Sequence, residues 1–421
     1  MKMKKISMMV GGVMMLLAVG CNGGGEDADI TEEAEGTPAP GGPDDEGGGE
    51  EVEVDTEVAE GTEVIDIGFS GPLSGAGAYY GNNTLNGISM AMEEINEDGG
   101  FEVDGETYSF NLVSLDDQYL PDETGANVRR LVQEDDTPFI FVPHSGGTYA
   151  TQVFNEQDEV LLGSYSSEPE ITQQGNDLTW RIPPTYDNYI EPFSEYQMER
   201  FGTDLAMLPP NTEFGMDWAE ALGPAWEEMG GDVIHESSVD YAQDTDFYTL
   251  VTNALADDPD VLFVGGSSEP TAQVMSQARE LGFEGGFLVM DQAKLDEIDN
   301  VLGGAPDVIE GSVGVAPLVD DIHEGNEQFV SDYQEMHDAD PGSEAGYHYY
   351  SVYILAEAMK AAGETEDAHA IREHLDEGLH QVDEDKRIYD VSGIDEDGGM
   401  TTELRMAVVE DGEVELVDFD H

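Results

Sequence analysis

The sequence predicts an α/β protein in which two doubly wound parallel-sheet lobes are joined by a hinge. First, short apolar strands alternate with amphipathic helices throughout the body of the chain. Second, the first strand runs into a polar, glycine-rich loop and then a helix, a unit whose loop binds small ligands at the carboxyl end of the strand. Third, the alternation starts again near residue 204. The body of about 360 residues is long enough for two domains of ~100–200 residues each.

The first lobe is expected to begin with a strand over 64–69. The helix that follows carries apolar residues between Ile88 and Ile95 and ends at Gly99-Gly100. The alternation continues with a strand over 110–115, a helix over 123–133, a strand over 139–142, a helix over 150–157 and a strand over 160–162. Repeated strand–loop–helix units produce a parallel sheet with helices on both faces.

The second lobe repeats this alternation. Its expected elements are the strands 204–207, 233–234, 261–264 and 287–290 and the helices 218–229, 247–255 and 272–281. The chain then runs extended over 311–316, and the late elements are helices over 327–337, 347–362 and 368–377 and a strand over 406–409.

The lobes are expected to exchange chain more than once. We assign residues 63–182 and 317–386 to the first lobe and residues 183–316 and 387–421 to the second. Several extended crossings then act as a hinge, and a ligand binds between the strand carboxyl ends of the two lobes.

The segment 67–101, IGFSGPLSGAGAYYGNNTLNGISMAMEEINEDGGF, carries the most specific motif. Further markers follow in order: Asp116-Asp117, EPEIT, Asp246-Phe247, QARELGF and Glu310-Gly311. Together they resemble, over nearly the whole body, the solute-binding proteins of branched-chain amino-acid ABC importers (leucine/isoleucine/valine-binding proteins). The resemblance implies a type I periplasmic binding protein clamshell that is not an enzyme and has no cofactor. It also implies a small amino acid as ligand and importer permease subunits as partners.

The N-terminus is predicted to be an export signal over residues 1–20. Three lysines precede an apolar run over 6–19, which is shorter than the ~20 residues of a membrane span and has the form of a signal peptide core. Ala18-Val19-Gly20-Cys21 resembles a lipobox, although Ala18 stands where leucine is usual. We therefore expect Cys21 to be lipidated and to anchor the protein at the cell surface. The alternative is an ordinary signal peptide with an incidental free thiol.

Residues 21–62 are predicted to form a disordered acidic tether. The stretch is dominated by Gly, Glu, Asp, Pro and Thr and shows no apolar periodicity, so it cannot bury enough apolar surface to fold alone. Such a tether would hold the folded body away from the membrane.

The chain is very acidic, with a net charge of −80. Removing residues 1–20 takes away three of the 14 basic residues and none of the 94 acidic ones, which gives a mature charge of −83. Nucleic acid is excluded as a partner because phosphate binding needs basic patches. Acidity alone suggests disorder, but the clear strand and helix patterns contradict this, so we infer a protein of a salt-in halophile.

This inference predicts that the protein loses its fold at low salt. At 1 M salt the Debye length is about 3 Å, and the repulsion between surface carboxylates is screened. In dilute buffer the repulsion acts at full range and favours expansion. Thermal scans at decreasing KCl concentration test this, and an intact cooperative transition in dilute buffer would contradict it.

In the first lobe, Ser145 is the principal candidate for ligand contact. It follows a buried strand in a Gly-Gly turn that opens a helix, and the N–H groups of such a turn favour a carboxylate. Helix capping is the alternative role for Ser145. The family resemblance adds Thr148 from the same loop and Ser166 and Ser167 from the next strand end. Tyr80, in the opening motif, either stacks on the ligand or packs on the first helix.

In the second lobe, Asp291 ends a strand and aligns with the acidic residue that pairs the ligand ammonium in the resembling family. A cationic amine needs such a partner in a dry cleft. The alternative for Asp291 is a solvated loop charge. Phe214 stands where the family usually has Tyr, and Ser267 where it often has an aromatic residue.

Two other functions are alternatives to amino-acid capture. Urea or short amides would fit the same fold, because Phe214 and Ser267 alter the family's pocket. A secreted hydrolase would need a serine, base and oxyanion set, and none stands out, so no catalytic residue is assigned. No metal site is expected, because His369, His374 and His380 are spaced by five and six residues and do not share a helical face.

Overall fold

The computed structural model describes Gly49, Glu51–Val52 and residues 56–320, 323, 325–402 and 405–418. The predicted signal peptide, Cys21 and most of the predicted tether lie outside the described residues. Glu51–Val52, however, belongs to the segment predicted as a tether and forms β1, which pairs antiparallel with Leu115 and Ser114. The ordered body therefore begins earlier than residue 63.

The first sheet has the order β1-β4-β2-β5-β6-β7, with β3 paired to the outer side of β4. β2, β4, β5, β6 and β7 run parallel, whereas β1 and β3 are antiparallel to β4. β4 and β5 lie on opposite sides of β2, so the strand order reverses there, which is where doubly wound sheets bind ligands. The bounds are β1 (Glu51–Val52), β2 (Glu63–Gly71), β3 (Phe101–Val103), β4 (Glu106–Asp116), β5 (Phe139–Val142), β6 (Leu161–Ser164) and β7 (Thr179–Arg181).

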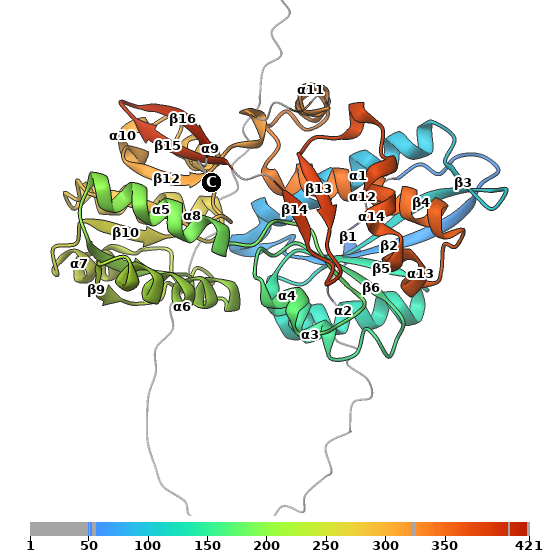
Figure 1. Ribbon diagram of the computed structural model, residues 1–421, viewed down its shortest axis with the longest axis horizontal. Coiled ribbons are helices and arrows are strands. Elements are labelled where there is room, and N and C mark those ends of the chain that lie inside the picture. Colours follow the sequence, from blue (N-terminus) through green and yellow to red (C-terminus); the bar gives the residue numbers. More distant parts are fainter. Residues whose placement is uncertain are drawn as a thin grey trace, which may run out of the picture. The chain divides into compact units, whose positions relative to one another are not determined.

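The second sheet has the order β16-β15-β12-β11-β10-β8-β9 (Figure 1). Five strands run parallel, and the β15–β16 hairpin adds antiparallel to β12. The strand order reverses around β8, which lies between β9 and β10. The bounds are β8 (Asp204–Leu208), β9 (Asp232–Glu236), β10 (Val261–Val264), β11 (Gly286–Val289), β12 (Ser312–Val315), β15 (Arg405–Glu410) and β16 (Glu413–Asp418).

Helices cover both sheets. Those of the first half are α1 (Ala78–Glu97), α2 (Pro121–Glu134), α3 (Ser145–Gln152), α4 (Glu170–Gln173), α5 (Asp187–Arg200), α6 (Glu213–Glu228) and α7 (Tyr248–Leu255). Those of the second half are α8 (Ser268–Glu280), α9 (Leu295–Val301), α10 (Pro306–Ile309), α11 (Asn326–His337), α12 (Ser343–Ala362), α13 (Ala368–Glu373) and α14 (Leu375–Gln381). Among the described residues, none of these helices combines the length and apolar character that a membrane crossing requires.

Both faces of each sheet are buried. In β5, Phe139 and Phe141 belong to the core under α1 and α12, whereas Ile140 and Val142 pack on the opposite face. In β10, Leu262 and Val264 belong to one apolar cluster of the second lobe, and Val261 and Phe263 belong to another. Burial on both faces explains why these strands are continuous apolar runs rather than alternating ones.

The glycine of the NG motif in the opening segment has a packing role. A Cβ on Gly87 would lie 2.0 Å from the carbonyl oxygen of Ala345, so α1 and α12 approach closely only because this residue has no side chain. This contact joins an early and a late helix of the first lobe.

The predicted helices differ from the observed ones at α3 and α5. The helix expected over 150–157 is α3, which begins at Ser145, because the His144 side chain caps it and Gly146 and Gly147 form its first turn. α5 was not predicted at all. It carries Pro192 in its interior and mixes aromatic with acidic residues, so its periodicity is weak.

The C-terminal segment divides between the lobes. β13 (Val391–Ile394) pairs with β14 (Met400–Thr402), and Ile388, Ile394 and Met400 pack into the core of the first lobe. In Figure 1 this hairpin lies beside α12 and α14, and α14 and β13 are in contact. Only β15 and β16 join the second sheet, so the boundary predicted at residue 387 lies too early.

Candidate functional site

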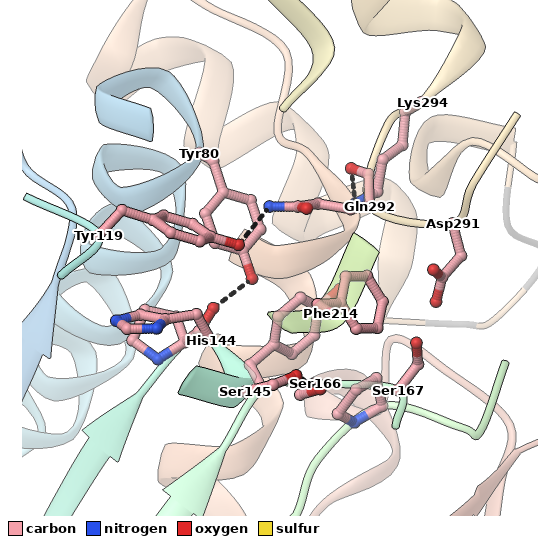
Figure 2. Close-up of a pocket in the computed structure, with 13 residues that line it drawn as sticks. Tyr80, Tyr119, His144, Ser145, Ser166, Ser167, Phe214, Asp291, Gln292 and Lys294 are labelled. Carbon is pink, nitrogen blue, oxygen red and sulfur yellow. Dashed lines mark hydrogen bonds between the residues drawn. The ribbon is translucent and has the colours of Figure 1, made fainter. Parts of the chain in front are cut away.

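A pocket lies between the two lobes, at the carboxyl ends of their parallel strands (Figure 2). The first lobe contributes the loops that follow β4, β5 and β6 together with α1, and the second contributes α6 and the loop after β11. The lining residues are Tyr80, Tyr119, Pro143, His144, Ser145, Tyr165, Ser166, Ser167, Pro183, Phe214, Asp291, Gln292 and Lys294.

The wall from the first lobe is built around the N-terminus of α3. The Ser145 hydroxyl lies 2.6 Å from the Ser166 hydroxyl, so the two strand-end loops are joined by a hydrogen bond at the pocket. The first N–H groups of a helix have no partner within the helix and carry its positive dipole end. This wall is therefore suited to a carboxylate.

His144 fixes this helix start. Its Nδ1 accepts the Gly147 N–H at 2.9 Å, so the ring proton lies on Nε2, which donates to Asp117 Oδ2 at 2.9 Å. The Tyr119 ring stacks on the imidazole at 4.7 Å. Both nitrogens are thus committed, and His144 has none left to take a proton from the neighbouring Ser145. The geometry does not support the hydrolase alternative.

Two tyrosines form the floor of the pocket. Tyr80 donates its hydroxyl to the Pro143 carbonyl oxygen at 2.7 Å, and its ring lies 6.2 Å from that of Tyr165. Burial raises the pKa of both phenols, so both remain neutral. Tyr80 thereby supports the loop before α3 while its ring lines the pocket.

Asp291 presents a carboxylate from the second lobe. Trp218 donates its indole N–H to Oδ1 at 3.0 Å, which orients the side chain. In Figure 2 the carboxylate points toward Ser167 on the opposite wall. Burial raises the pKa of Asp291, and the hydrogen-bond donors around it and the Lys294 ammonium oppose this effect.

Lys294 joins the lobes through buried charges. Its Nζ donates to the Gln292 carbonyl oxygen at 2.8 Å and lies 3.2 Å from Glu344 Oε2 on α12 of the first lobe. Burial alone would lower the pKa of Lys294, but Glu344, Glu297 and Asp291 raise it above its ordinary value. The Lys294 ammonium therefore stays charged and balances the buried carboxyls of Glu344 and Glu297.

A second contact crosses the cleft at the pocket. Gln292 Nε2 donates to the Tyr119 hydroxyl at 3.1 Å, as the dashed line in Figure 2 marks. Beyond it lies a larger cavity of about 620 Å³, which shares Tyr119, His144, Ser145, Phe214 and Gln292 with the pocket. The pocket itself is small, about 30 Å³, and opens toward this outer cavity through the shared residues.

Six of the eight residues predicted to meet a ligand line the pocket: Tyr80, Ser145, Ser166, Ser167, Phe214 and Asp291. Ser267 lies instead on the outer cavity. Thr148 is fully buried, donates to the His144 carbonyl oxygen at 3.0 Å and lies 2.7 Å from the Ser164 hydroxyl. It supports α3 from behind and does not line the pocket.

Sequence reasoning missed Tyr119, His144, Tyr165, Gln292 and Lys294. One signal was present for Lys294, which is one of only three lysines after the predicted signal peptide. A lysine that persists in so acidic a chain indicates a specific partner. Within the described part of the chain, no group of three or more His, Cys, Asp or Glu side chains is placed to hold a metal ion.

The comparisons with known proteins agree with this architecture. Residues 64–413 match a family model described as "Periplasmic binding protein". The chain is 28% identical over 313 residues to an amino acid binding protein of Pseudomonas aeruginosa, covering 72% of this chain and 80% of the relative. It is 23% identical over 300 residues to the Leu/Ile/Val-binding protein homolog 1 of Brucella abortus, covering 70% and 78%. The relatives are named as binding proteins rather than enzymes.

Solved structures share the fold. A leucine binding protein of Thermotoga maritima superposes with a TM-score of 0.69 at 21% identity, covering 85% of this chain and 99% of that one. A branched-chain amino acid transporter substrate binding protein of Streptococcus pneumoniae, solved with isoleucine, gives 0.69 at 21% identity and covers 84% and 99%. The predicted fold class and family resemblance are confirmed. Proteins of this family act outside the cytoplasm, which is the compartment predicted from the sequence. The chain belongs to the periplasmic binding protein family.

Proposed function

We propose that this protein captures a small amino acid, branched-chain or similar, in the cleft between its lobes and delivers it to an ABC importer. One observation carries the proposal: the N-terminus of α3 and the Asp291 carboxylate lie on opposite walls of the same pocket. The first attracts an anion and the second a cation. A zwitterion bridges both and thereby favours the closed arrangement of the lobes.

The head group of the amino acid would occupy the pocket. Its carboxylate would accept N–H groups from the first turn of α3 and the Ser145 hydroxyl, and its ammonium would face Asp291. Because the pocket is only about 30 Å³, the side chain of the ligand would extend into the adjoining cavity of about 620 Å³. That cavity supplies Phe214, Tyr241 and Pro210 as apolar surface.

The similar proteins support an aliphatic amino acid, since the Brucella abortus relative is named a Leu/Ile/Val-binding protein homolog and the Streptococcus pneumoniae structure was solved with isoleucine. We further propose that residues 1–20 direct export, that Cys21 carries a lipid anchor and that the acidic surface is an adaptation to high salt. Permease subunits would recognise the closed form.

Urea or short amides remain the second candidate ligands. Phe214 provides an aromatic wall without a hydroxyl, and a neutral ligand would not need the charge of Asp291. A ligand of this class would fill the small pocket and leave the outer cavity to solvent.

Isothermal titration in multimolar KCl tests the proposal. The panel comprises leucine, isoleucine, valine, alanine, glutamate, urea and acetamide. We expect saturable binding of an aliphatic amino acid that weakens in Ser145→Ala by roughly 10- to 150-fold, because one hydrogen bond to a charged group contributes about 1.5–3 kcal/mol. Binding of urea or acetamide alone would overturn the proposed ligand, and binding of nothing by the folded protein would overturn the proposal as a whole.

A further inference from the structure

Glu168 is a buried carboxyl group that the proposed ligand contacts do not use. It follows β6 in the first lobe and is 2% exposed. The Tyr149 hydroxyl of α3 donates to Oε1, whereas the buried Oε2 has no hydrogen-bond donor among the described residues. A buried carboxylate oxygen without a donor is costly, so the partner of Oε2 needs an explanation.

The group that faces Glu168 across the cleft is a second carboxyl. Asp217 lies on α6 of the second lobe and lines the same cavity of about 340 Å³ as Glu168 and Tyr149. Ionised carboxylates only accept hydrogen bonds. The contact can therefore form only when one proton lies between the two groups, and that proton also satisfies the orphaned oxygen of Glu168.

The surroundings favour uptake of this proton. The groups that act on the pair are Tyr149 from α3, Glu170 from α4, Glu213 and Glu220 from α6, and Tyr186 before α5. All of them are acidic or phenolic. Burial raises the pKa of Glu168 to about 8, the Tyr149 hydrogen bond opposes this, and Asp217 raises it further. Burial also raises the pKa of Asp217.

The pair is connected to the ligand site. The Glu168 backbone N–H donates to the Ser166 hydroxyl at 3.3 Å, and Ser166 is bonded at 2.6 Å to Ser145. Position and hydrogen bonding of Glu168 therefore depend on the same loops that would hold the ligand carboxylate.

We propose that Glu168 and Asp217 form a proton-bridged contact between the lobes, so that closing the cleft on a ligand takes up a proton. This rests on the proposed function for its ligand but not for the contact itself. When the lobes separate, Glu168 meets water and Asp217 moves away, and the proton is released. Because closure takes up a proton, the protein holds its ligand more tightly in mildly acidic surroundings.

The raised pKa of Glu168 sets the direction in which ligand affinity changes with pH. Below about pH 5 both the open and the closed form carry the proton, and closure is not penalised. Between about pH 5 and pH 8 only the closed form keeps it, so affinity falls by at most roughly tenfold per pH unit. Above about pH 8 the penalty no longer grows.

Thermal unfolding of the full chain in multimolar KCl, between pH 5.5 and 9 and with and without leucine, tests the contact. Glu168→Gln supplies an amide N–H that donates to Asp217 without a proton, and its carbonyl can still accept from Tyr149. We expect the Tm of Glu168→Gln to rise relative to that of wild type as the pH increases. The increase in Tm that leucine causes in this variant should not depend on pH. Glu220→Gln, an exposed acid on the same helix, should follow the wild-type profile.

The outcomes are separable. If leucine shifts neither protein at any pH, the proposed ligand fails, and the ligand-free profiles of wild type and Glu168→Gln decide on the contact. If those two profiles are parallel in every condition, the proton bridge is wrong. Replacing KCl with choline chloride tests an alkali ion in the acidic cavity of about 340 Å³ beside the pair. If choline chloride lowers the Tm of wild type at pH 6 but not that of Glu168→Gln, the alkali ion rather than a proton makes the contact. That result would overturn the proposal.

Discussion

Replacing Asp291 with asparagine is expected to weaken amino-acid binding by about 30-fold to several thousand-fold. Truncating one partner of a buried, hydrogen-bonded charge pair costs ~2–5 kcal/mol, and each 1.4 kcal/mol corresponds to a factor of ten. The substitution keeps the shape of the side chain and its contact with Trp218 but removes the negative charge that would face the ligand ammonium. Titration of leucine into the variant in multimolar KCl measures the loss.

The control is Asp258→Asn, an exposed aspartate of the same lobe that should leave affinity unchanged. Circular dichroism and the unfolding temperature establish that the variants are folded. Leucine binding by Asp291→Asn at wild-type strength would exclude the zwitterion clamp. Retained binding of urea or acetamide, with no binding of amino acids by wild type, would favour the second class of ligand.

Replacing Lys294 with methionine is expected to destabilise the protein by ~3–5 kcal/mol, which is the effect of breaking a buried ion pair by removing one partner. Lys294 is 2% exposed, and the side chains of Lys294 and Glu344 are 3% and 1% exposed. Methionine has a similar length but no charge. Glu344 and Glu297 would both be left without their cation. Burial and the neighbouring Glu344 already raise the pKa of Glu297. Urea unfolding at constant salt concentration measures the change.

Lys360→Met is the matched control, because Lys360 pairs with Glu357 on the surface, where an ion pair contributes about 0–1 kcal/mol. The stability lost in Lys294→Met should shrink as the pH falls, because the Glu297 carboxyl, whose pKa burial raises, then takes up a proton and no longer needs a cation. Adding Glu344→Gln should restore part of the lost stability. Equal stabilities of the Lys294 and Lys360 variants would show that the buried pair does not hold the lobes together.

The strands were predictable because their composition is set by burial. β5, β10 and β11 are short apolar runs between polar loops, and each is covered on both faces. Elements without such a signal were missed. β1 and β7 are two and three residues long, and β13 and β14 pair only with each other. β1 depends on β4, which lies far along the chain, whereas β7, β13 and β14 are too short and too mixed in polarity to show a strand pattern.

The site shows the same division. Ser145 was predicted from its place after a buried strand, because the carboxyl ends of parallel strands converge on one edge of a sheet. The family resemblance added Ser166 and Asp291 at other strand ends. Thr148 was assigned to the pocket by the family resemblance, as part of a loop before a helix expected over 150–157. Once the helix begins at Ser145, residue 148 lies in its first turn and its hydroxyl points back to the His144 carbonyl.

The two α/β lobes, the family and most of the strand-end residues that line the cleft could be predicted from the amino-acid sequence. These follow from local periodicity, from motif order and from the geometry of parallel sheets. The pairing of side chains across the cleft is visible only in the folded molecule. The partners Lys294 and Glu344, and Glu168 and Asp217, are about 50 residues apart in the chain, and the energy of each contact depends on burial that both lobes create together.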